Sequence, residues 1–490
     1  MKGVKIMEET RKNGMLVDVD EFPKSWGQAT ILAIQHVLAM FVACITVPLI
    51  VFSSYTTSDG ANLAQLLIAP TIVSAGVGTL FYLFMTKFKS PMFLASSFAY
   101  LSPMISAVAI GFTDTGKPNL WLLPIGMAMV GLVYVIVAII IKFCGVKWLN
   151  KLLPPLVIGP VIMVIGLGLA GSAINNLNNT ASGTYNLLHI LSGLVAMVVT
   201  GICAHYGKKT LSLIPFVIGM GAGYLFALII TLIGYYGAGS EYCKIVDLSP
   251  IVNNFVVDGK FRGFQAFLDY PKFLFLQAEN SQPLSWSGVA QAAMLFVPVS
   301  LVTICEHIGD HENMSGVIQK NLLEEPGLDR TLIGDGVATA LSGGLCGAAN
   351  TTYGENVAVV GVSKVASTRV IAMACGIAIL LGFLSPLMAI VQTIPGCICG
   401  GVSLVLYGFI ASSGVKILMA NKIDMGATKS IFVASTILVA GIGGLAINFS
   451  IGQVAFSISS TAVAMILGII MNVILKDKKE DKPAAPAEGE

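Results

Sequence analysis

The stretch "VPVSLVTICEHIGDHENMS" carries four ionisable side chains within six residues, directly after a run of apolar and small residues. Glu306 and Asp310 stand four residues apart, so a helix places both carboxylates on one face, whereas His307 and His311 form a second stripe about 100° further round. Such a cluster can bind a metal ion, meet water at a helix end, or line a buried binding site. The rest of the sequence decides between these three hypotheses.

The metal hypothesis is the weakest of the three. "HIGDH" has the two-histidine spacing of a zinc-binding helix, but Ile308 stands where that motif has its catalytic glutamate. No third ligand stands out and the cysteines supply no CxxC pair, so we expect no metal site. Polar residues follow His311 directly, which indicates that His307 and His311 lie at a wet helix end. Glu306 lies deeper, on the same face as Thr303.

The composition is that of a polytopic membrane protein. Of 490 residues 55% are hydrophobic and only 11% are charged, with a mean hydropathy of +0.84; soluble domains carry about 25% charged residues. The net charge of +2 and the lack of a basic patch interleaved with aromatics argue against a nucleic-acid partner. Nine scattered cysteines form no disulfide framework. No nucleophile elbow or complete metal motif favours an enzyme.

Hydropathy predicts fourteen membrane spans, each a candidate to cross about 30 Å of hydrocarbon. They lie near 29–53, 61–85, 92–112, 121–143, 152–174, 187–206, 210–236, 288–309, 331–349, 351–363, 368–393, 396–413, 428–449 and 454–475. Every second connection is rich in Lys or Arg, which predicts that both termini lie in the cytoplasm. We therefore expect a cytoplasmic N-terminal segment (1–28), an extracellular loop (237–287) and a cytoplasmic tail (476–490), with no cleaved signal peptide.

The sequence repeats itself faintly. "PPLVIGPVIMVIGLGLAGSA" (154–173) aligns without gaps to "PGCICGGVSLVLYGFIASSG" (395–414), and "SSFA" (96–99) resembles "TTYG" (351–354). Each pairing is seven spans apart, so the halves have opposite orientation, as in the inverted repeats of secondary transporters. Chance identity in a sequence rich in Gly and Val is the alternative.

Two short, polar segments at matching places in the two halves indicate a substrate site. The third and tenth spans are interrupted by Pro103 and Gly354, and broken backbone at membrane depth is tolerated where it lines a cavity. Glu355 stands in a nearly uncharged stretch, where a charge is costly and usually functional. The alternative is a pair of short helices whose hydroxyls pack against neighbours. His36 and Asp335 fit structural hydrogen bonding between helices better than ligand binding.

These residues together resemble the nucleobase–ascorbate transporter family, and most closely its bacterial uracil–proton symporters. The resemblance covers roughly residues 25–475, and its specific parts are "QHVLAMF", "ASSFAYLSP", "EHIGDH", "PGLDRTLIGDG" and "NTTYGENVAVVGVSK". The family signature [Q/E/P]-N-x-G-x-x-x-x-T-[R/K/G] is met by Glu355, Asn356 and Lys364, with Ala358 in place of the glycine and Ser363 in place of the threonine. Glutamate before the asparagine tilts the resemblance toward uracil rather than purines.

The resemblance implies an all-α fold of fourteen transmembrane segments in two inverted repeats of seven, with short strands in segments 3 and 10. It implies a core domain (29–143 and 288–393) and a gate domain (152–236 and 396–475), between which the substrate binds. Family members often form homodimers. The protein is then a multi-pass protein of the cell (inner or plasma) membrane, in contact with the lipid bilayer.

The resemblance also implies the residues of the site. The positions that match the uracil site are Ala43, Phe98, Glu306, Tyr353, Gly354 and Glu355, with Asn356, His36 and Ser97 in support. The coupling ion is H⁺, carried by Glu306 with Asp310, and no other cofactor is expected. The carboxylates accept from the two ring N–H groups of uracil, backbone N–H groups serve its carbonyls, and an aromatic ring packs on its face.

One departure from the family pattern concerns proton coupling. The uracil symporters have a histidine four residues after the glutamate of the eighth helix, where this chain has Asp310 with His311 beside it. A carboxylate there can join the proton relay or cap a wet cavity. Two other functions remain open, namely a xanthine or uric acid symporter of the same family and an anion exchanger or channel of similar architecture.

Overall fold

The computed structural model describes residues 14–475, apart from 53–54, 58–61, 181–182, 209–213, 258, 274, 276–277 and 452–453. The segment 1–13 and the tail 476–490 therefore lie outside the described residues. The principal helices are α1 (Trp26–Phe52), α2 (Leu63–Met85), α3 (Leu101–Ala109), α5 (Leu122–Cys144), α7 (Pro155–Gly168), α8 (Ala170–Asn178), α9 (Leu187–Tyr206), α10 (Pro215–Ile230), α12 (Trp286–Ile318), α13 (Leu328–Gly344), α14 (Gly354–Ser363), α15 (Thr368–Phe383), α16 (Ser385–Gln392), α17 (Gly396–Ala420), α18 (Thr428–Ile442) and α19 (Ser460–Ile474).

Eight helices in the described part of the chain are long and apolar enough to cross a membrane. They are Trp26–Phe52, Leu63–Met85, Leu122–Cys144, Pro155–Asn178, Leu187–Tyr206, Pro215–Gly237, Trp286–Ile318 and Gly396–Ala420. Several carry exposed Leu, Ile, Val and Phe side chains along their length, as lipid-facing helices do. The other six expected spans contain helices of 17 residues or fewer.

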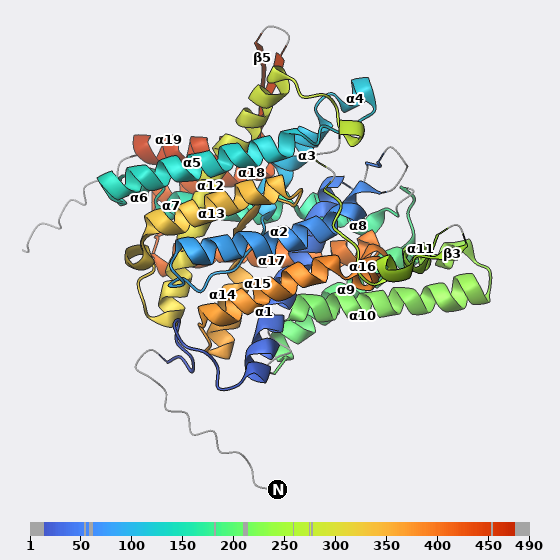
Figure 1. The fold of residues 1–490 in the computed structure, drawn as a ribbon. Helices are drawn as coiled ribbons and strands as arrows, with labels where there is room; N and C mark the ends of the chain where they lie inside the picture. The colour runs from blue at the N-terminus through green and yellow to red at the C-terminus, as the bar shows by residue number, and fades with distance from the viewer. Residues whose placement is uncertain are drawn as a thin grey trace, which may run out of the picture.

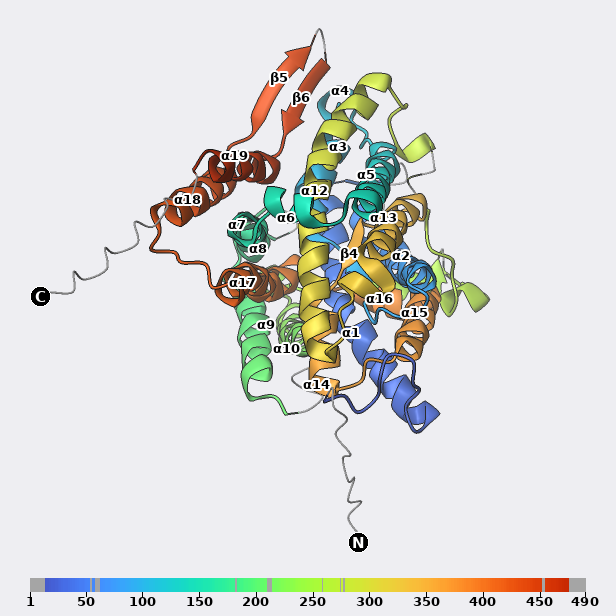
Figure 2. The ribbon, with the colours of Figure 1, turned by 90° about the vertical axis from the view of Figure 1, so that its left-hand side faces the viewer.

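The helices form two groups on either side of α12. In one group α13 packs between α5 and α2, α2 packs on α15, and α1 contacts both α2 and α15 (Figure 1). In the other, α17 contacts α7, α8 and α9, α10 packs on α9, and α18 lies between α7 and α19. Figure 2 shows α12 upright at the centre, with α7 and α17–α19 on one side and α2, α13 and α15 on the other. Helix α1 also contacts α10 and α17 of the second group directly.

Two three-residue strands lie among α1, α2, α12 and α13, inside otherwise helical segments. β1 (Leu94–Ser96) follows α2, and β4 (Asn350–Thr352) follows α13. They pair antiparallel with Leu94 opposite Thr352 and Ser96 opposite Asn350. Every residue of both strands is buried. Helices then leave the ladder in both segments, since Phe98 begins a 3-10 turn before α3 and Gly354 begins α14.

The end of the chain departs from the expected all-helical spans. The ranges 428–449 and 454–475 are not helical throughout, because strands β5 (Ile447–Ile451) and β6 (Val454–Ile458) form an antiparallel hairpin between α18 and α19. The reason is the period of the sequence, "INFSI" and "VAFSI", in which apolar residues alternate with small or polar ones as strands require. The hairpin rises beside the N-terminal half of α12 (Figure 2).

The long loop 237–287 is folded and packs over neighbouring helices. It contains α11 (Ser249–Phe255) and the two-stranded hairpin β2 (Val256–Val257) and β3 (Lys260–Phe261). Its backbone bonds the turn between α15 and α16, where Asp269 N–H donates to the Phe383 carbonyl (3.1 Å) and Ser385 N–H to the Phe267 carbonyl (3.1 Å). The loop is thereby tied to the group of helices around α2.

Candidate substrate site

The β1–β4 ladder is held in place by hydroxyls from the helices beneath it. Thr79 of α2 donates to the Leu94 carbonyl (3.1 Å) and accepts from the Leu94 N–H (2.9 Å). Thr339 of α13 donates to the Asn350 carbonyl (2.7 Å). Extended backbone inside a bundle needs such partners, since an unpaired buried N–H or C=O costs free energy. The ladder is therefore a fixed platform on which the following residues are displayed.

Three carboxylates converge on this platform from two helices. Glu306 and Asp310 share one face of α12, and Glu355 lies in the first turn of α14 directly after β4. Asp310 Oδ2 accepts a 2.7 Å hydrogen bond from the Thr352 hydroxyl. Helix α12 packs directly against α14 and β4, which brings the elements that carry these three carboxylates together. Glu306 Oε2 is buried and has no hydrogen-bond partner among the described residues.

The remaining residues predicted to contact substrate lie around the same platform. Phe98 and Tyr353 follow β1 and β4 and are 7% and 5% exposed. Gly354 faces α12, because a Cβ at that position would lie 3.4 Å from Asp310 Oδ1. Ala43 is fully buried on α1, the helix that packs against β1 and α14. Sequence-distant residues from four elements thus surround one location.

The three supporting residues fall into two kinds. Asn356 of α14 donates to His36 Nδ1 (3.0 Å) and to the His36 carbonyl (3.2 Å), and both side chains are buried. This pair ties α14 to α1 and so has the structural character expected for His36. Ser97 is different, since its backbone N–H donates to the Ala349 carbonyl (2.8 Å) while its buried hydroxyl has no hydrogen-bond partner in the described chain.

The prediction that His307 and His311 lie at a wet helix end is wrong. Helix α12 continues to Ile318, and both imidazoles are completely buried. His307 Nδ1 lies 2.8 Å from Asp335 Oδ2 on α13, and His311 Nε2 lies 2.6 Å from the Tyr82 hydroxyl on α2. Polar sequence after His311 suggested water, but α2 and α13 supply partners that only the tertiary structure reveals.

Two further residues belong to this region although the sequence did not single them out. Tyr407 of α17 is buried and its ring meets Phe98 edge-on, with centroids 5.5 Å apart. It brings the second group of helices against the platform. Thr352 donates to Asp310, and its only signal in the sequence was its place in the hydroxyl pair before Tyr353. In the described residues no three His, Cys, Asp or Glu side chains are arranged to hold a metal ion.

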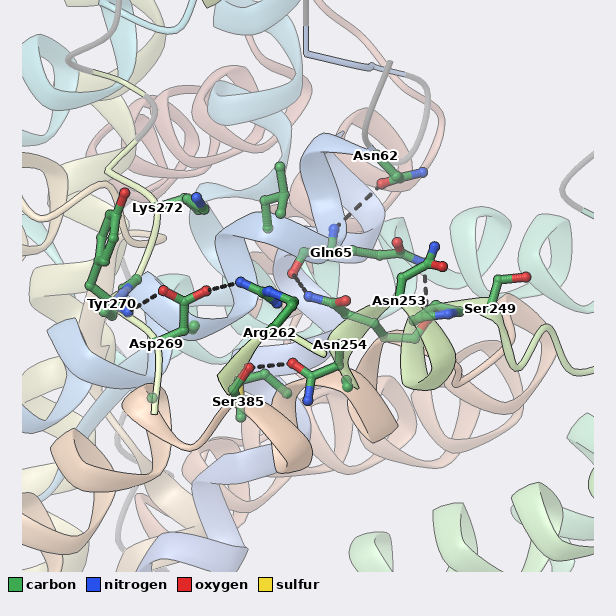
Figure 3. A pocket seen from close by; sticks show the side chains of 18 of the residues that line it. Asn62, Gln65, Ser249, Asn253, Asn254, Arg262, Asp269, Tyr270, Lys272 and Ser385 are labelled. Atoms are coloured by element: carbon green, nitrogen blue, oxygen red, sulfur yellow. Dashed lines mark hydrogen bonds and ion pairs between the residues drawn. The ribbon is translucent and has the colours of Figure 1, made fainter. Parts of the chain in front are cut away.

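A separate polar cavity of about 440 Å³ lies where the loop covers α2 and α16 (Figure 3). Its wall includes Gln65, Asn254, Lys272 and the ion pair between Arg262 Nη2 and Asp269 Oδ2 (2.8 Å). None of the residues predicted for the substrate site lines this cavity. It is therefore distinct from the carboxylate platform.

Chemically, the platform suits a small flat molecule with N–H donors. Ionised carboxylates accept hydrogen bonds and cannot donate them, and an aromatic face beside them packs on a planar ring. An anion would meet the repulsion of three carboxylates. A molecule that binds here would have to match the hydrogen-bonding groups and the charge of the platform, which lies among helices long enough to span a membrane.

Fold and site together define a multi-pass membrane transporter. A profile of the Permease family matches residues 27–449. The chain is 38% identical to a uracil permease of Bacillus caldolyticus over 468 residues (96% of both chains), 38% identical to one of Bacillus subtilis (94% of both), and 32% identical to one of Escherichia coli K12 (91% of this chain, 90% of that one). The chain belongs to this permease family, the nucleobase–ascorbate transporters that its motifs resemble, and it is not an enzyme.

Solved structures share the fold at low sequence identity. The murine anion transporter Slc26a9 in its inward-facing state superposes with a TM-score of 0.61 at 8% identity, covering 93% of this chain and 69% of that one. The transmembrane domain of the cyanobacterial bicarbonate transporter BicA gives 0.56 at 10% identity, covering 93% and 99%. The fold is thus that of a known class of transporters.

Proposed function

We propose that this protein takes up uracil together with protons by alternating access. The observation that carries the proposal is the meeting of Glu306, Asp310 and Glu355 beside Phe98 and Tyr353, in a chain 38% identical to uracil permeases along almost its whole length. Glu306 and Glu355 accept from the ring N–H groups. Phe98 or Tyr353 packs on the ring, and backbone N–H groups near the ladder serve the carbonyls.

Proton coupling follows from the same carboxylates. Several like charges in one buried site cannot all stay ionised, because each disfavours the charged form of the others. Glu306 takes up a proton with the substrate on one side and releases it on the other. Asp310 shares this role, and its hydrogen bond from Thr352 links the proton on α12 to the strand that precedes Glu355.

The architecture that serves this cycle is a pair of inverted seven-span repeats. The two sequence alignments relate residues that contact each other. Extended by one residue, the alignment of "SSFA" with "TTYG" matches Ala95 with Asn350 and Ser96 with Thr351. The ladder pairs Ala95 with Thr351 and Ser96 with Asn350, so exchanging each residue for its aligned counterpart turns one pair into the other. In the other alignment Gly166 matches Tyr407, and these two residues contact each other where α7 packs on α17. Contacts that are unchanged when each residue is replaced by its aligned counterpart support a two-fold relation between the two halves of the chain. On this basis we assign fourteen spans, counting the short helices and both strand-containing segments.

The two groups of helices provide the moving parts. The group around α2, α13 and α15 corresponds, together with α12 and α14, to the core domain that carries the carboxylates, whereas the group around α17 corresponds to the gate domain. The contact between Phe98 and Tyr407 lies between them. Uptake then requires that the core slide or rock against the gate around the bound base. We place both termini in the cytoplasm of a cell-membrane protein and expect a homodimer.

A purine symporter is the alternative within the family. Xanthine and uric acid also present ring N–H donors, so the carboxylates alone do not exclude them. The anion transporters of similar fold are a weaker alternative, because the resemblance is of fold only and three carboxylates disfavour an anion. Glutamate rather than glutamine before Asn356 favours uracil.

Labelled uracil uptake tests the proposal in cells that lack their own carrier. Uptake that a protonophore abolishes and that excess xanthine leaves unchanged is the expected result. Uptake that xanthine blocks would move the substrate to the purines. Uptake that resists the protonophore would remove proton coupling, and no uptake would overturn the uracil assignment.

A further inference from the structure

A chain of buried hydroxyls and imidazoles leads from α12 toward the face predicted to be cytoplasmic. The Ser90 hydroxyl lies 2.8 Å from the Tyr82 hydroxyl, which lies 2.6 Å from His311 Nε2. All three side chains are completely buried. Ser90 is one residue from exposed Lys89, in the basic connection between α2 and β1. The chain therefore begins one residue from exposed Lys89 and ends at His311, which follows Asp310 in α12.

The hydrogen-bond geometry fixes which nitrogen of His311 can change its protonation. His311 Nδ1 lies 2.7 Å from the His307 carbonyl oxygen, which can only accept, so Nδ1 carries a hydrogen. Nε2 then either accepts a hydrogen bond from the Tyr82 hydroxyl through its lone pair, or carries a hydrogen and donates it to the Tyr82 hydroxyl. Both states keep every hydrogen bond in the chain, because the two hydroxyls can reverse their direction.

The neighbouring pair His307–Asp335 holds one proton of its own. Thr331 donates to the Leu328 carbonyl (3.1 Å), so His307 Nε2 must donate to Thr331 (3.0 Å). One proton then lies between His307 Nδ1 and Asp335 Oδ2, and the pair is neutral overall. The His307 ring stacks on His311 with centroids 4.1 Å apart. The titratable groups facing His311 are thus this neutral pair and Tyr82, with Asp310 next in the chain.

Apolar residues pack around Tyr82, the middle member of the chain. Tyr82 belongs to a buried cluster with Met92, Leu94, Met314 and Val19. Val19 joins this cluster from the N-terminal segment, whose backbone forms hydrogen bonds with the backbone of residues 364–368. A purely structural tyrosine needs one partner, whereas Tyr82 joins two groups that can both donate and accept.

We propose that Ser90, Tyr82 and His311 form a proton relay through which His311, the residue next to Asp310 on α12, exchanges a proton with the cytoplasm. Inward, Tyr82 gives its hydroxyl proton to His311 Nε2 as it receives one from Ser90, whose own proton is replaced from the cytoplasmic side next to Lys89. One N–H bond forms at His311, each hydroxyl exchanges one O–H bond for another, and release is the reverse. A charge on His311 shifts the proton equilibrium of adjacent Asp310, which couples the relay to the site. This inference rests on the proposed proton coupling.

The test uses the full-length protein in sealed vesicles with two assays. Net uracil uptake driven by a pH gradient requires proton release, whereas exchange of labelled for unlabelled uracil at equal pH on both sides does not. Tyr82→Phe keeps the ring and removes the hydroxyl. We expect its net uptake to fall by about 10²-fold, the low end of what a positioned proton-transfer group contributes, with exchange at the wild-type rate.

Ser90→Ala breaks the relay at its outer end and carries the same test if Tyr82→Phe fails to fold. Tyr134→Phe is the matched control, since it removes a buried hydroxyl from the ring that meets His307 edge-on but lies outside the chain. Both assays should stay normal there. Normal net uptake in Tyr82→Phe, or equal loss of uptake and exchange, would overturn the relay. If net uracil uptake by the wild-type protein did not depend on the pH gradient, the proposed proton coupling would be overturned as well.

Discussion

At the scale of single residues, the candidate site contains a carboxylate oxygen that has no hydrogen-bond partner in the described part of the chain. Glu306 Oε2 is buried without a partner in the described residues, whereas nearby Asp310 is bonded by Thr352. Buried polar atoms are almost always paired in proteins, and exceptions often mark function. Glu306 is therefore the side chain whose loss should affect substrate most directly.

Glu306→Gln tests this assignment with the least change in shape. The substitution replaces a charged acceptor by a neutral one, which costs about 1.5–3 kcal/mol of hydrogen bonding, or roughly 10- to 100-fold in uracil affinity. Calorimetric binding to the purified protein measures the effect. Glu312→Gln, on the exposed face of the same helix, should bind normally. Efficient uptake by Glu306→Gln that a proton gradient still stimulates would contradict both roles of Glu306.

At the scale of elements, close helix packing depends on glycines at particular positions. Helices α9 and α17 meet backbone to backbone, because a Cβ on Gly401 would lie 2.0 Å from the Gly193 carbonyl oxygen. Backbone cannot yield as a flexible side chain does. The two helices must therefore separate if either glycine acquires a side chain.

Gly401→Ala should destabilise the protein by about 1–3 kcal/mol, the usual cost of overpacking a close contact. Gly408→Ala is a matched control on the same helix, because a Cβ there meets nothing within 4 Å. Thermal unfolding in detergent compares the two, and we expect only Gly401→Ala to unfold at lower temperature. Equal stability of both variants would show that α9 and α17 can separate freely.

The N-terminal segment is a second element with a testable role. Val19 is 2% exposed and packs with Tyr82 and Met92, whereas Leu16 is 44% exposed. Val19→Asp places an unpaired charge in an apolar cluster and should cost several kcal/mol, of the size known for buried uncompensated charges. Leu16→Asp should be tolerated. Thermal unfolding again decides, and similar midpoints for the two variants would show that the segment is not anchored there.

The sequence predicted some elements well and others poorly, for physical reasons. Apolar runs of 20 residues or so have one stable solution in lipid, so the eight long helices were predictable. The β5–β6 hairpin was missed because total hydropathy outweighed the alternation in "INFSI". Asp335 and His307 were judged separately, since a pair 28 residues apart on different helices leaves no local pattern. Motif resemblance supplied the platform residues, which local spacing alone did not.

At the scale of the whole molecule, basic residues gather on connections at one end of the helices. Lys89, Lys320 and Lys364 lie on connections at one end, where Lys320 Nζ bonds Asp18 (2.7 Å) and Lys89 pairs with Glu325. The folded loop that contains α11 lies at the opposite end of the helices that it covers (Figure 1). If basic connections face the cytoplasm, this loop faces outward.

Single cysteines introduced on a cysteine-free background test this orientation. Phe264 on the loop is 73% exposed, and the Glu325 side chain near the basic end is 72% exposed. We expect a membrane-impermeant thiol reagent to label Phe264→Cys in intact cells and Glu325→Cys only after the membrane is opened. That result would place the two residues on opposite faces of the membrane, so that an odd number of crossings separates them. Helix α12 lies between the two residues in the sequence, and as the eighth span it would supply one crossing. Labelling of both residues from one side would show that α12 does not cross the membrane and would exclude the fourteen-span inverted repeat.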